Sequence, residues 1–327
     1  MTALRAFLTA IARALLLLLA VSAMVFVATE LLPGDAAGAR ASNGATVEQV
    51  AALRAETGQD RPAWQRYTAW LGSLATGRLG TSLVNDRPVA DAISQRLPAS
   101  TALVVLALAF AGPLILVIGC WAGAGSRTRG TRTAVVTGLA AVPQVVLAAV
   151  LSALFAGALG WLPPVSLLPP GGSPLESPHL LILPVLSVAL PTVVFGAGLL
   201  AGAVADTVRR PHAVDSRLRG TPTVLFFARD VVPFLLTPLA RVVAISAGGL
   251  IAAATVVETL FGYPGLGSLL VTSVSARDTP VVQAVAMAAA AVVLGGLLLA
   301  DVIAVLADPR RAPRPKRRAP RYLGVQP

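Results

Sequence analysis

Long apolar stretches alternate with short polar ones along nearly the whole chain. A run of about 18 or more apolar residues with few charges is typical of a helix that spans a membrane. No charged residue lies between Arg96 and Arg127, between Arg132 and Glu176, or between Glu176 and Asp206. The pattern predicts six spanning helices, over residues 6–29, 100–123, 133–158, 180–204, 234–257 and 280–305.

The first apolar run has a basic start, as a cleaved signal peptide has. It is longer than the apolar core of a signal peptide, which has roughly 7–15 residues. We therefore interpret residues 6–29 as a retained helix in which the side chain of Arg13 extends to the nearer membrane surface.

Arginine is distributed unequally between the two sides of the predicted membrane protein. One set of loops, together with the tail after residue 309, has a large excess of Lys and Arg over acidic residues, whereas the other set is neutral. Positive loops stay in the cytoplasm, so both termini are predicted to be cytoplasmic. The net charge of +11 is thus mainly a topology signal. We interpret the basic segment 310–321 as a solvated tail near anionic lipid rather than as a nucleic-acid site.

Residues 33–98 form a long stretch that no predicted span covers, on the outer side. Thr46 begins a capping-box pattern, and Pro62 suits the first turn of a second helix. That second helix would have one apolar stripe, formed by Trp64, Tyr67, Leu71 and Leu74. The segment is either two or three short helices on the membrane surface or a small packed subdomain with its own core.

Several kinds of chemistry are missing from the sequence. The one lysine, Lys316, lies in the tail, and no glycine-rich nucleotide-binding motif precedes a lysine. His179 and His212 belong to no zinc-ligand pattern, and Cys120 has no second cysteine with which to pair. We predict no catalytic residue, no metal and no cofactor.

Ionisable residues in the middle of a membrane usually mark a path for ions or protons. Here Glu30, Arg241, Glu258 and Asp301 all fall near the ends of predicted spans. This placement argues against a proton-coupled carrier. It favours a passage that opens and closes by rearrangement of helices, with energy supplied by another protein.

The cytoplasmic connection 205–233, between the fourth and fifth spans, is long and basic and contains several prolines. A stiff connection transmits a displacement that a flexible one would absorb, and proline stiffens it. Gly220 permits a close approach or a backbone angle that other residues resist. The composition is equally consistent with a loop whose arginines only fix the topology.

Five stretches resemble, in order, the inner-membrane permease subunits of ATP-binding-cassette (ABC) importers for dipeptides, oligopeptides and nickel. They are ELLPGDAA (30–37), TGQDRPAWQRYTAWLGSLATGRLGTSL (57–83), RPVADAISQRLPAST (87–101), VVETLFGYPGLGSLLVTSVSARDTPVVQA (256–284) and LADPRRA (306–312). The chain looks like the first of the two permease subunits in such a system. Ala36 and Arg78 depart from the family pattern, which has proline and aspartate there.

The resemblance implies an all-α, polytopic membrane protein with six transmembrane helices and a type I importer (MetI-like) permease core. The expected parts are an N-terminal transmembrane helix, an extracytoplasmic segment with short interfacial helices, a five-helix core and a basic cytoplasmic tail, over residues 1–32, 33–98, 99–307 and 308–327. The expected partners are a second permease subunit in a heterodimer, two ABC ATPase subunits, an extracytoplasmic solute-binding protein and membrane lipid. The expected location is the plasma (inner) membrane.

In this family a short cytoplasmic helix docks on the ATPase, and the connection 205–233 takes its place here. Gly220 matches the glycine of the family motif, and Pro233 and Pro238 follow it at the family's spacing. The motif normally begins with glutamate-alanine-alanine, which is altered here, so docking is weaker or depends more on the second permease. We expect residues 214–227 to form the coupling helix, and the candidate coupling residues are Val214, Asp215, Ser216, Arg217, Arg219, Gly220, Val224, Pro233 and Pro238.

A second group of candidate residues belongs to the family signature and to the outer mouth of the passage. The stretch FGYPGLG (261–267) has the composition of a tight turn. It lies near the passage and faces the binding protein, or it is a purely structural turn. The group consists of Pro33, Gly34, Asp35, Gly80, Ser82, Glu258, Gly262, Pro264, Gly265, Gly267, Arg277 and Asp278.

Other functions stay open at this point. One is a self-contained channel or secondary carrier, against which the position of the charges weighs. Another is a membrane-embedded enzyme, against which the missing catalytic residues weigh. A third is a partly degenerate permease subunit with weak transport, which the altered coupling motif suggests. Peptides are the first choice of substrate and nickel is the second, with other small solutes open.

Overall fold

The computed structural model of the chain describes residues 2–31, 61–124, 128–167 and 176–306. The described residues are helical apart from turns and one isolated bridge between Thr81 and Pro88. The helices are α1 (Thr2–Glu30), α4 (Ala63–Ala75), α5 (Val89–Gly123), α6 (Arg129–Ala140), α7 (Gln144–Ser152) with the π-helical turn η1 (Ala153–Ala158), α8 (Pro178–Thr207), α9 (Pro211–Leu218), α10 (Thr223–Phe226) with the π-helical turn η3 (Phe227–Val231), α11 (Val232–Leu260), α12 (Leu266–Ser275) and α13 (Thr279–Leu306).

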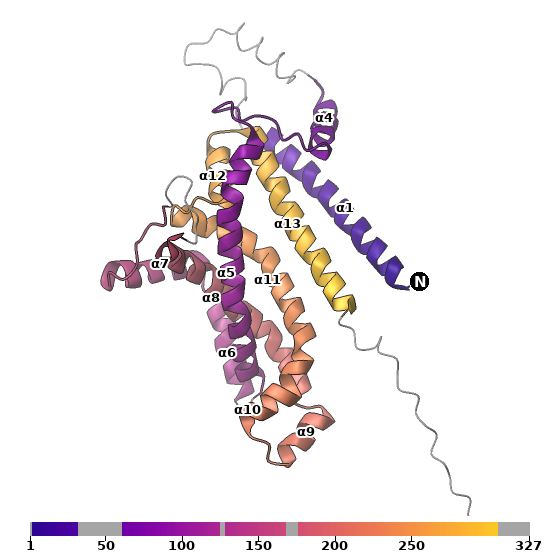
Figure 1. Ribbon diagram of the computed structural model, residues 1–327, viewed down its shortest axis with the longest axis vertical. Coiled ribbons are helices and arrows are strands. Elements are labelled where there is room, and N and C mark those ends of the chain that lie inside the picture. The colour runs from indigo at the N-terminus through magenta and orange to yellow at the C-terminus, as the bar shows by residue number, and fades with distance from the viewer. Residues whose placement is uncertain (1, 32–60, 125–127, 168–175, 307–327) are drawn as a thin grey trace, which may run out of the picture.

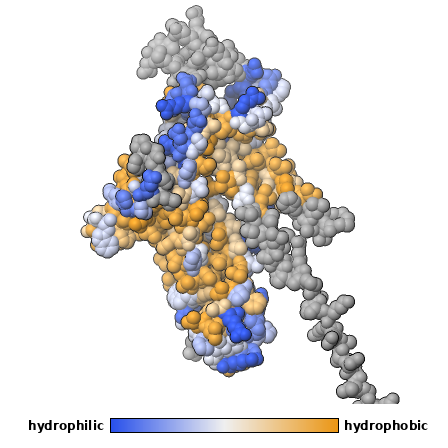
Figure 2. Space-filling model, in the orientation of Figure 1, coloured by the Kyte–Doolittle hydropathy of each residue, from blue (hydrophilic) through white to orange (hydrophobic). Residues whose placement is uncertain are grey.

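The membrane-spanning character of the predicted helices is confirmed. The described part of the chain has five helices long and apolar enough to cross a membrane, namely α1, α5, α8, the α10–α11 segment and α13, or six if α6 and α7 together count as one. In Figure 2 a largely hydrophobic surface covers the middle of these helices, and hydrophilic residues gather at the two ends of the bundle. Figure 1 places α4 and α12 at one end, and α9 and α10 at the other.

The third predicted span, 133–158, is not one straight helix. Its two halves, Arg129–Ala140 and Gln144–Ala158, meet at an angle of 82°. Pro143 explains the break, because proline has no backbone N–H to donate and disfavours a helical conformation at the residue before it. The prediction of a continuous helix overlooked this single proline within an otherwise apolar run.

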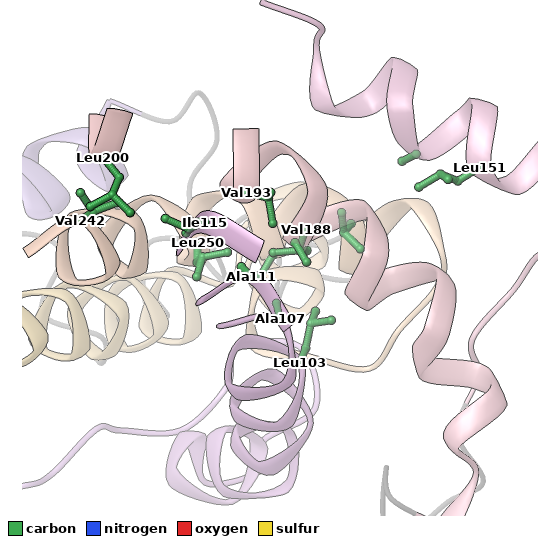
Figure 3. Packing of buried hydrophobic residues seen from close by; sticks show 14 of the residues in the cluster. Leu103, Ala107, Ala111, Ile115, Leu151, Val188, Val193, Leu200, Val242 and Leu250 are labelled. Atoms are coloured by element: carbon green, nitrogen blue, oxygen red, sulfur yellow. The ribbon is translucent and has the colours of Figure 1, made fainter. Parts of the chain in front are cut away.

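The core of the bundle lies where α5, α8 and α11 meet. Figure 3 shows side chains from all three helices gathered in one cluster, among them Ala111, Val193 and Leu250. Glycines allow α5 and α8 to approach each other closely. A Cβ atom on Gly123 would lie 2.4 Å from the carbonyl oxygen of Ala201, and one on Gly196 would lie 2.6 Å from the side chain of Ile115. Small residues allow such close packing of helices within a membrane.

Helix α4 is the second helix predicted in the segment 33–98, and it packs on the C-terminal part of α1. The Tyr67 ring lies edge-on to Phe26, with ring centroids 5.4 Å apart, and the hydroxyls of Tyr67 and Ser22 are 2.9 Å apart. The predicted apolar stripe is shifted, because Trp64 is 66% exposed and Trp70 lies against Phe26 instead. The first predicted helix of this segment, and Pro33, Gly34 and Asp35, lie outside the described residues.

Candidate coupling site and outer turn

The connection between α8 and α11 folds as two short helices around Gly220. Helix α9 ends at Leu218, and α10 begins at Thr223, so the single helix expected within 214–227 is wrong. Gly220 has a φ of +74°, a conformation that L residues with side chains rarely adopt. Pro222, which directly precedes α10, keeps an extended conformation with ψ of 140°. These two residues therefore turn the chain between the helices.

Polar side chains fasten α9 to the π-helical turn that leads into α11. The Ser216 hydroxyl donates a hydrogen bond to Oδ2 of Asp230 over 2.6 Å. The Thr221 hydroxyl donates to the carbonyl oxygen of Ser216 over 2.8 Å. The ring of His212 stacks on that of Phe234, with centroids 4.5 Å apart. The connection is therefore held against the start of the fifth span.

The inner side of the connection is buried in the bundle. Ala213 is fully buried and Phe226 is 2% exposed, and both belong to the core cluster. The guanidinium of Arg217 lies over the ring of Phe226, 4.9 Å from its centroid. Arg219 forms an exposed ion pair with Asp215 over 2.6 Å. Both arginines thus have partners within this chain, and the exposed pair contributes little to stability.

The face of the connection that points away from the bundle carries apolar side chains that nothing in the described chain covers. Leu218 is 82% exposed and Val224 is 83% exposed. These two residues, with Val214 and Leu225, are called the loop patch below. The sequence prediction included Val214 and Val224 but missed Leu218 and Leu225. Both are large apolar residues within a connection that is otherwise rich in charge, and this was visible in the sequence.

The remaining predicted coupling residues lie in α11. Pro233 occupies the first turn of that helix, where a missing N–H costs nothing, and Pro238 lies inside it. Neither belongs to the loop patch. Their position fits the predicted stiffening of the return into the fifth span.

At the end of the bundle opposite α9 and α10, Glu258 holds the turn between α11 and α12. The side chain is 1% exposed. Its Oε2 accepts hydrogen bonds from the backbone N–H groups of Gly267 (2.7 Å) and Ser268 (3.1 Å), and its Oε1 accepts one from the Ser100 hydroxyl (2.6 Å). A negative group at the first turn of a helix is stabilised there. Glu258 therefore caps α12 and joins it to α5.

Glycines in the turn make room for this carboxylate. A Cβ atom on Gly265 would lie 2.1 Å from the Glu258 side chain, and one on Gly267 would lie 2.4 Å from Cα of Thr255. Gly262 has a φ of +62°. The Tyr263 hydroxyl donates a hydrogen bond to the carbonyl oxygen of Ala99 over 2.9 Å. Burial, and then the nearby Glu258 charge, raise the pKa of the Tyr263 phenol, so it stays a donor.

Asp278 forms a second contact of this kind, with the segment that precedes α5. Its carboxylate accepts hydrogen bonds from the Ser82 hydroxyl and, over 3.0 Å, from the backbone N–H of Leu83. Gly80, with a φ of +82°, and Arg277, with a φ of +57°, turn the chain on either side of the contact. Ser82 and Asp278 are far apart in the sequence and were predicted as members of separate motifs.

Most of the outer candidates that the structure describes therefore gather in two hydrogen-bonded centres, around Glu258 and around Asp278. Sequence reasoning missed Ser100 and Tyr263, whose partners lie on other elements. Glu258 also lines a cavity of about 290 Å³ between α5, α11, α12 and α13, whose other lining residues are mostly apolar. Pro264 lies within the turn, and its side chain is partly exposed.

Comparison with known proteins places the chain in a family. Residues 115–313 match the model of the binding-protein-dependent transport system inner membrane component. Residues 3–104 match the N-terminal domain that accompanies it. The chain belongs to this family. It is thus the permease of a binding-protein-dependent ABC importer, and the predicted family and fold class are confirmed.

The relatives of the permease match it over most of its length. A protein of Brucella abortus (strain 2308), assigned as a peptide transport system permease, is 31% identical over 307 residues, which is 92% of this chain and 96% of the relative. The glutathione transport system permease of Pectobacterium atrosepticum is 31% identical over 271 residues, 82% of this chain and 85% of the relative. A protein of Sinorhizobium fredii, assigned as a peptide ABC transporter permease, is 29% identical over 309 residues, 92% and 98% of the two chains.

Family membership also bears on the class of protein and its location. The family is one of transport permeases and not a known family of enzymes. With several apolar helices, the permease is a multi-pass protein of the inner membrane. Importers of this class combine such a permease with a partner permease, ATPases and a binding protein.

Proposed function

We propose that this permease forms half of a translocation pathway for peptides and that its loop patch docks on an ABC ATPase subunit. A second permease subunit forms the other half, a second ATPase completes the motor, and an extracytoplasmic binding protein delivers the peptide. The observation that carries the proposal is the exposure of Leu218 and Val224, 82% and 83%, at the cytoplasmic tip of an otherwise charged connection. An exposed apolar group of this kind marks a site of protein contact.

The attachment of the connection supports a role in transmitting movement. Ser216 is bonded to Asp230, and Phe226 is buried against the core formed by α5, α8 and α11. A displacement of the loop patch therefore moves the ends of the fourth and fifth spans rather than being absorbed in the connection. ATP binding drives the change only through different affinities for the two conformations of the importer.

The names of the relatives favour peptides as the substrate. The relatives from Brucella abortus and Sinorhizobium fredii are assigned to peptide transport, and the one from Pectobacterium atrosepticum to glutathione, itself a short peptide. Nickel, the second choice from the sequence, has no support among these relatives. The binding protein sets most of the selectivity in the proposed arrangement.

The orientation proposed from the arginines places the loop patch in the cytoplasm and α12 outside. In a Cys120→Ala background, a cysteine at Ser275 should react with an impermeant thiol reagent on intact cells. A cysteine at Thr223 should react only after permeabilisation, because both side chains are exposed but lie at opposite ends of the bundle (Figure 1). Reaction of the Thr223 cysteine in intact cells would show that the orientation is the reverse of the one proposed.

Reconstitution tests the proposed function. Proteoliposomes that contain both permease subunits and both ATPases, with the binding protein and a radiolabelled dipeptide outside and ATP inside, should accumulate the peptide. Omission of ATP or of the binding protein should abolish accumulation. The purified permease alone should hydrolyse no ATP, since its sequence has no nucleotide-binding motif. ATP-independent uptake by the permease alone would support a channel or secondary carrier instead.

A further inference from the structure

The distances of the α6–α7 corner, residues 140–143, from the two ends of the bundle indicate its depth in a membrane. Helix α6 has 12 residues, so it rises only about 18 Å from its first residue, Arg129, to the corner. On the far side of the corner, the Gln144 side chain donates a hydrogen bond to the carbonyl oxygen of Ala253 over 3.1 Å. Ala253 is about 10 Å along α11 from the outer end of that helix at Leu260. Both distances place the corner well inside a hydrocarbon layer about 30 Å thick.

Part of the backbone polar groups at this corner have partners: the N–H groups of Ala141 and Val142 donate to the carbonyl oxygens of Gly138 and Leu139. Others have no partner among the described residues. The carbonyl groups of residues 140–142 accept no hydrogen bond from any described residue. The N–H groups of Gln144, Val145 and Val146, in the first turn of α7, donate none, and that helix has no side-chain cap. The corner is also exposed on the surface of this chain. Lipid cannot satisfy these groups, so irregular backbone is not left exposed to lipid within the hydrocarbon layer.

The surface around the corner is apolar, and this feature argues against permanent contact with water. Leu139 is 56% exposed, Val142 41%, and Val145 and Val146 50% each. Small residues stand beside these large side chains: Ala140 and Ala141 separate Leu139 from Val142. Gly138 precedes them, and a Cβ atom there would meet nothing within 4 Å. Large apolar groups beside small residues are typical of a surface on which another helix packs closely within a membrane.

We propose that the α6–α7 corner is the contact surface for the second permease subunit. This inference rests on the proposed function, in which two different permease subunits form the pathway. A neighbouring helix covers the exposed valines, and its hydroxyl or amide side chains bond the free carbonyl and N–H groups of the corner. The 82° bend in the third span then serves assembly, because it turns α7 outward from the bundle (Figure 1).

Photocrosslinking in the complete importer tests this contact. A benzophenone amino acid is placed at Val142 or Val146, and at Val117 of α5 as a control that is 63% exposed. The two permease subunits carry different tags, so the partner in each adduct is identified. We expect an adduct with the second permease subunit at Val142 and Val146 and none at Val117. Failure of the complex to assemble with the bulky residue at both corner positions, but not at Val117, would also support the contact.

A second measurement tests whether the corner contacts the second permease subunit or instead lines the passage. A cysteine at Val142, in a Cys120→Ala background, should be protected from a small charged thiol reagent in the assembled importer. Reaction with that reagent would show that the corner lines the passage and would overturn the proposal. So would lipid adducts alone, or adducts between two copies of this permease. Peptide uptake by the unmodified importer is measured separately, so the contact can fail while the proposed function stands.

Discussion

Replacing Leu218 and Val224 together by aspartate is expected to abolish peptide uptake and to remove the ATPase from the purified importer. Burial of a leucine or valine side chain contributes about 1.5–3 kcal/mol each. Loss of both contacts should therefore weaken ATPase binding roughly 100-fold or more, before the cost of burying two charges is added. Co-purification of the tagged ATPase and uptake in membrane vesicles measure the two effects.

The matched control keeps both positions apolar. Leu218→Met with Val224→Ile should retain the ATPase and most of the uptake, because the loop patch stays hydrophobic and similar in volume. Membrane insertion should be normal in both variants, since the two side chains are 82% and 83% exposed and support no internal packing. If the aspartate variant kept its ATPase and transported peptide normally, the connection would be only a topological link between two spans.

The membrane architecture was predictable because length and apolarity decide it. The spans found as α1, α5, α8, α11 and α13 were each visible as long apolar runs. The bend at Pro143 was less visible, because composition alone does not show whether a proline kinks a membrane helix or breaks it. The role of the glycine-rich stretch 196–204 was not predictable, because it depends on Ile115, which meets Gly196 from another helix.

The sequence predicted which residues belong to the candidate site better than it predicted how those residues are arranged. Gly220 was identified from its motif position, and its positive φ provides the backbone angle that the prediction allowed for. The ion pair of Arg219 with Asp215 follows from their i,i+4 spacing on α9 and was foreseeable, but the contact of Arg217 with Phe226 joins two helices and was not. A contact such as Ser82 with Asp278 joins positions that no local pattern relates. Sequence spacing indicates which residues share an element, but it does not indicate which elements contact each other.

Replacing Glu258 by alanine is expected to cause the largest loss of stability among the outer candidates. The change leaves the N–H groups of Gly267 and Ser268 and the Ser100 hydroxyl without the acceptor that now binds them. Each unsatisfied buried group costs about 1–3 kcal/mol, so the free energy of unfolding should fall by roughly 3–5 kcal/mol. In detergent, the midpoint of thermal unfolding should fall by about 10 °C. Fluorescence-detected size exclusion after heating measures this midpoint.

Glu258→Gln distinguishes loss of the hydrogen bonds from loss of the charge. The amide oxygen of glutamine can accept both backbone N–H groups that now reach Oε2, and its NH₂ group can donate to the Ser100 hydroxyl oxygen. This variant should therefore unfold close to the temperature of the unchanged permease. Uptake should follow stability in both variants if Glu258 only builds the outer turn. If Glu258→Gln were stable but did not transport, the carboxylate would act on the substrate or the binding protein, and the structural account of the turn would be incomplete.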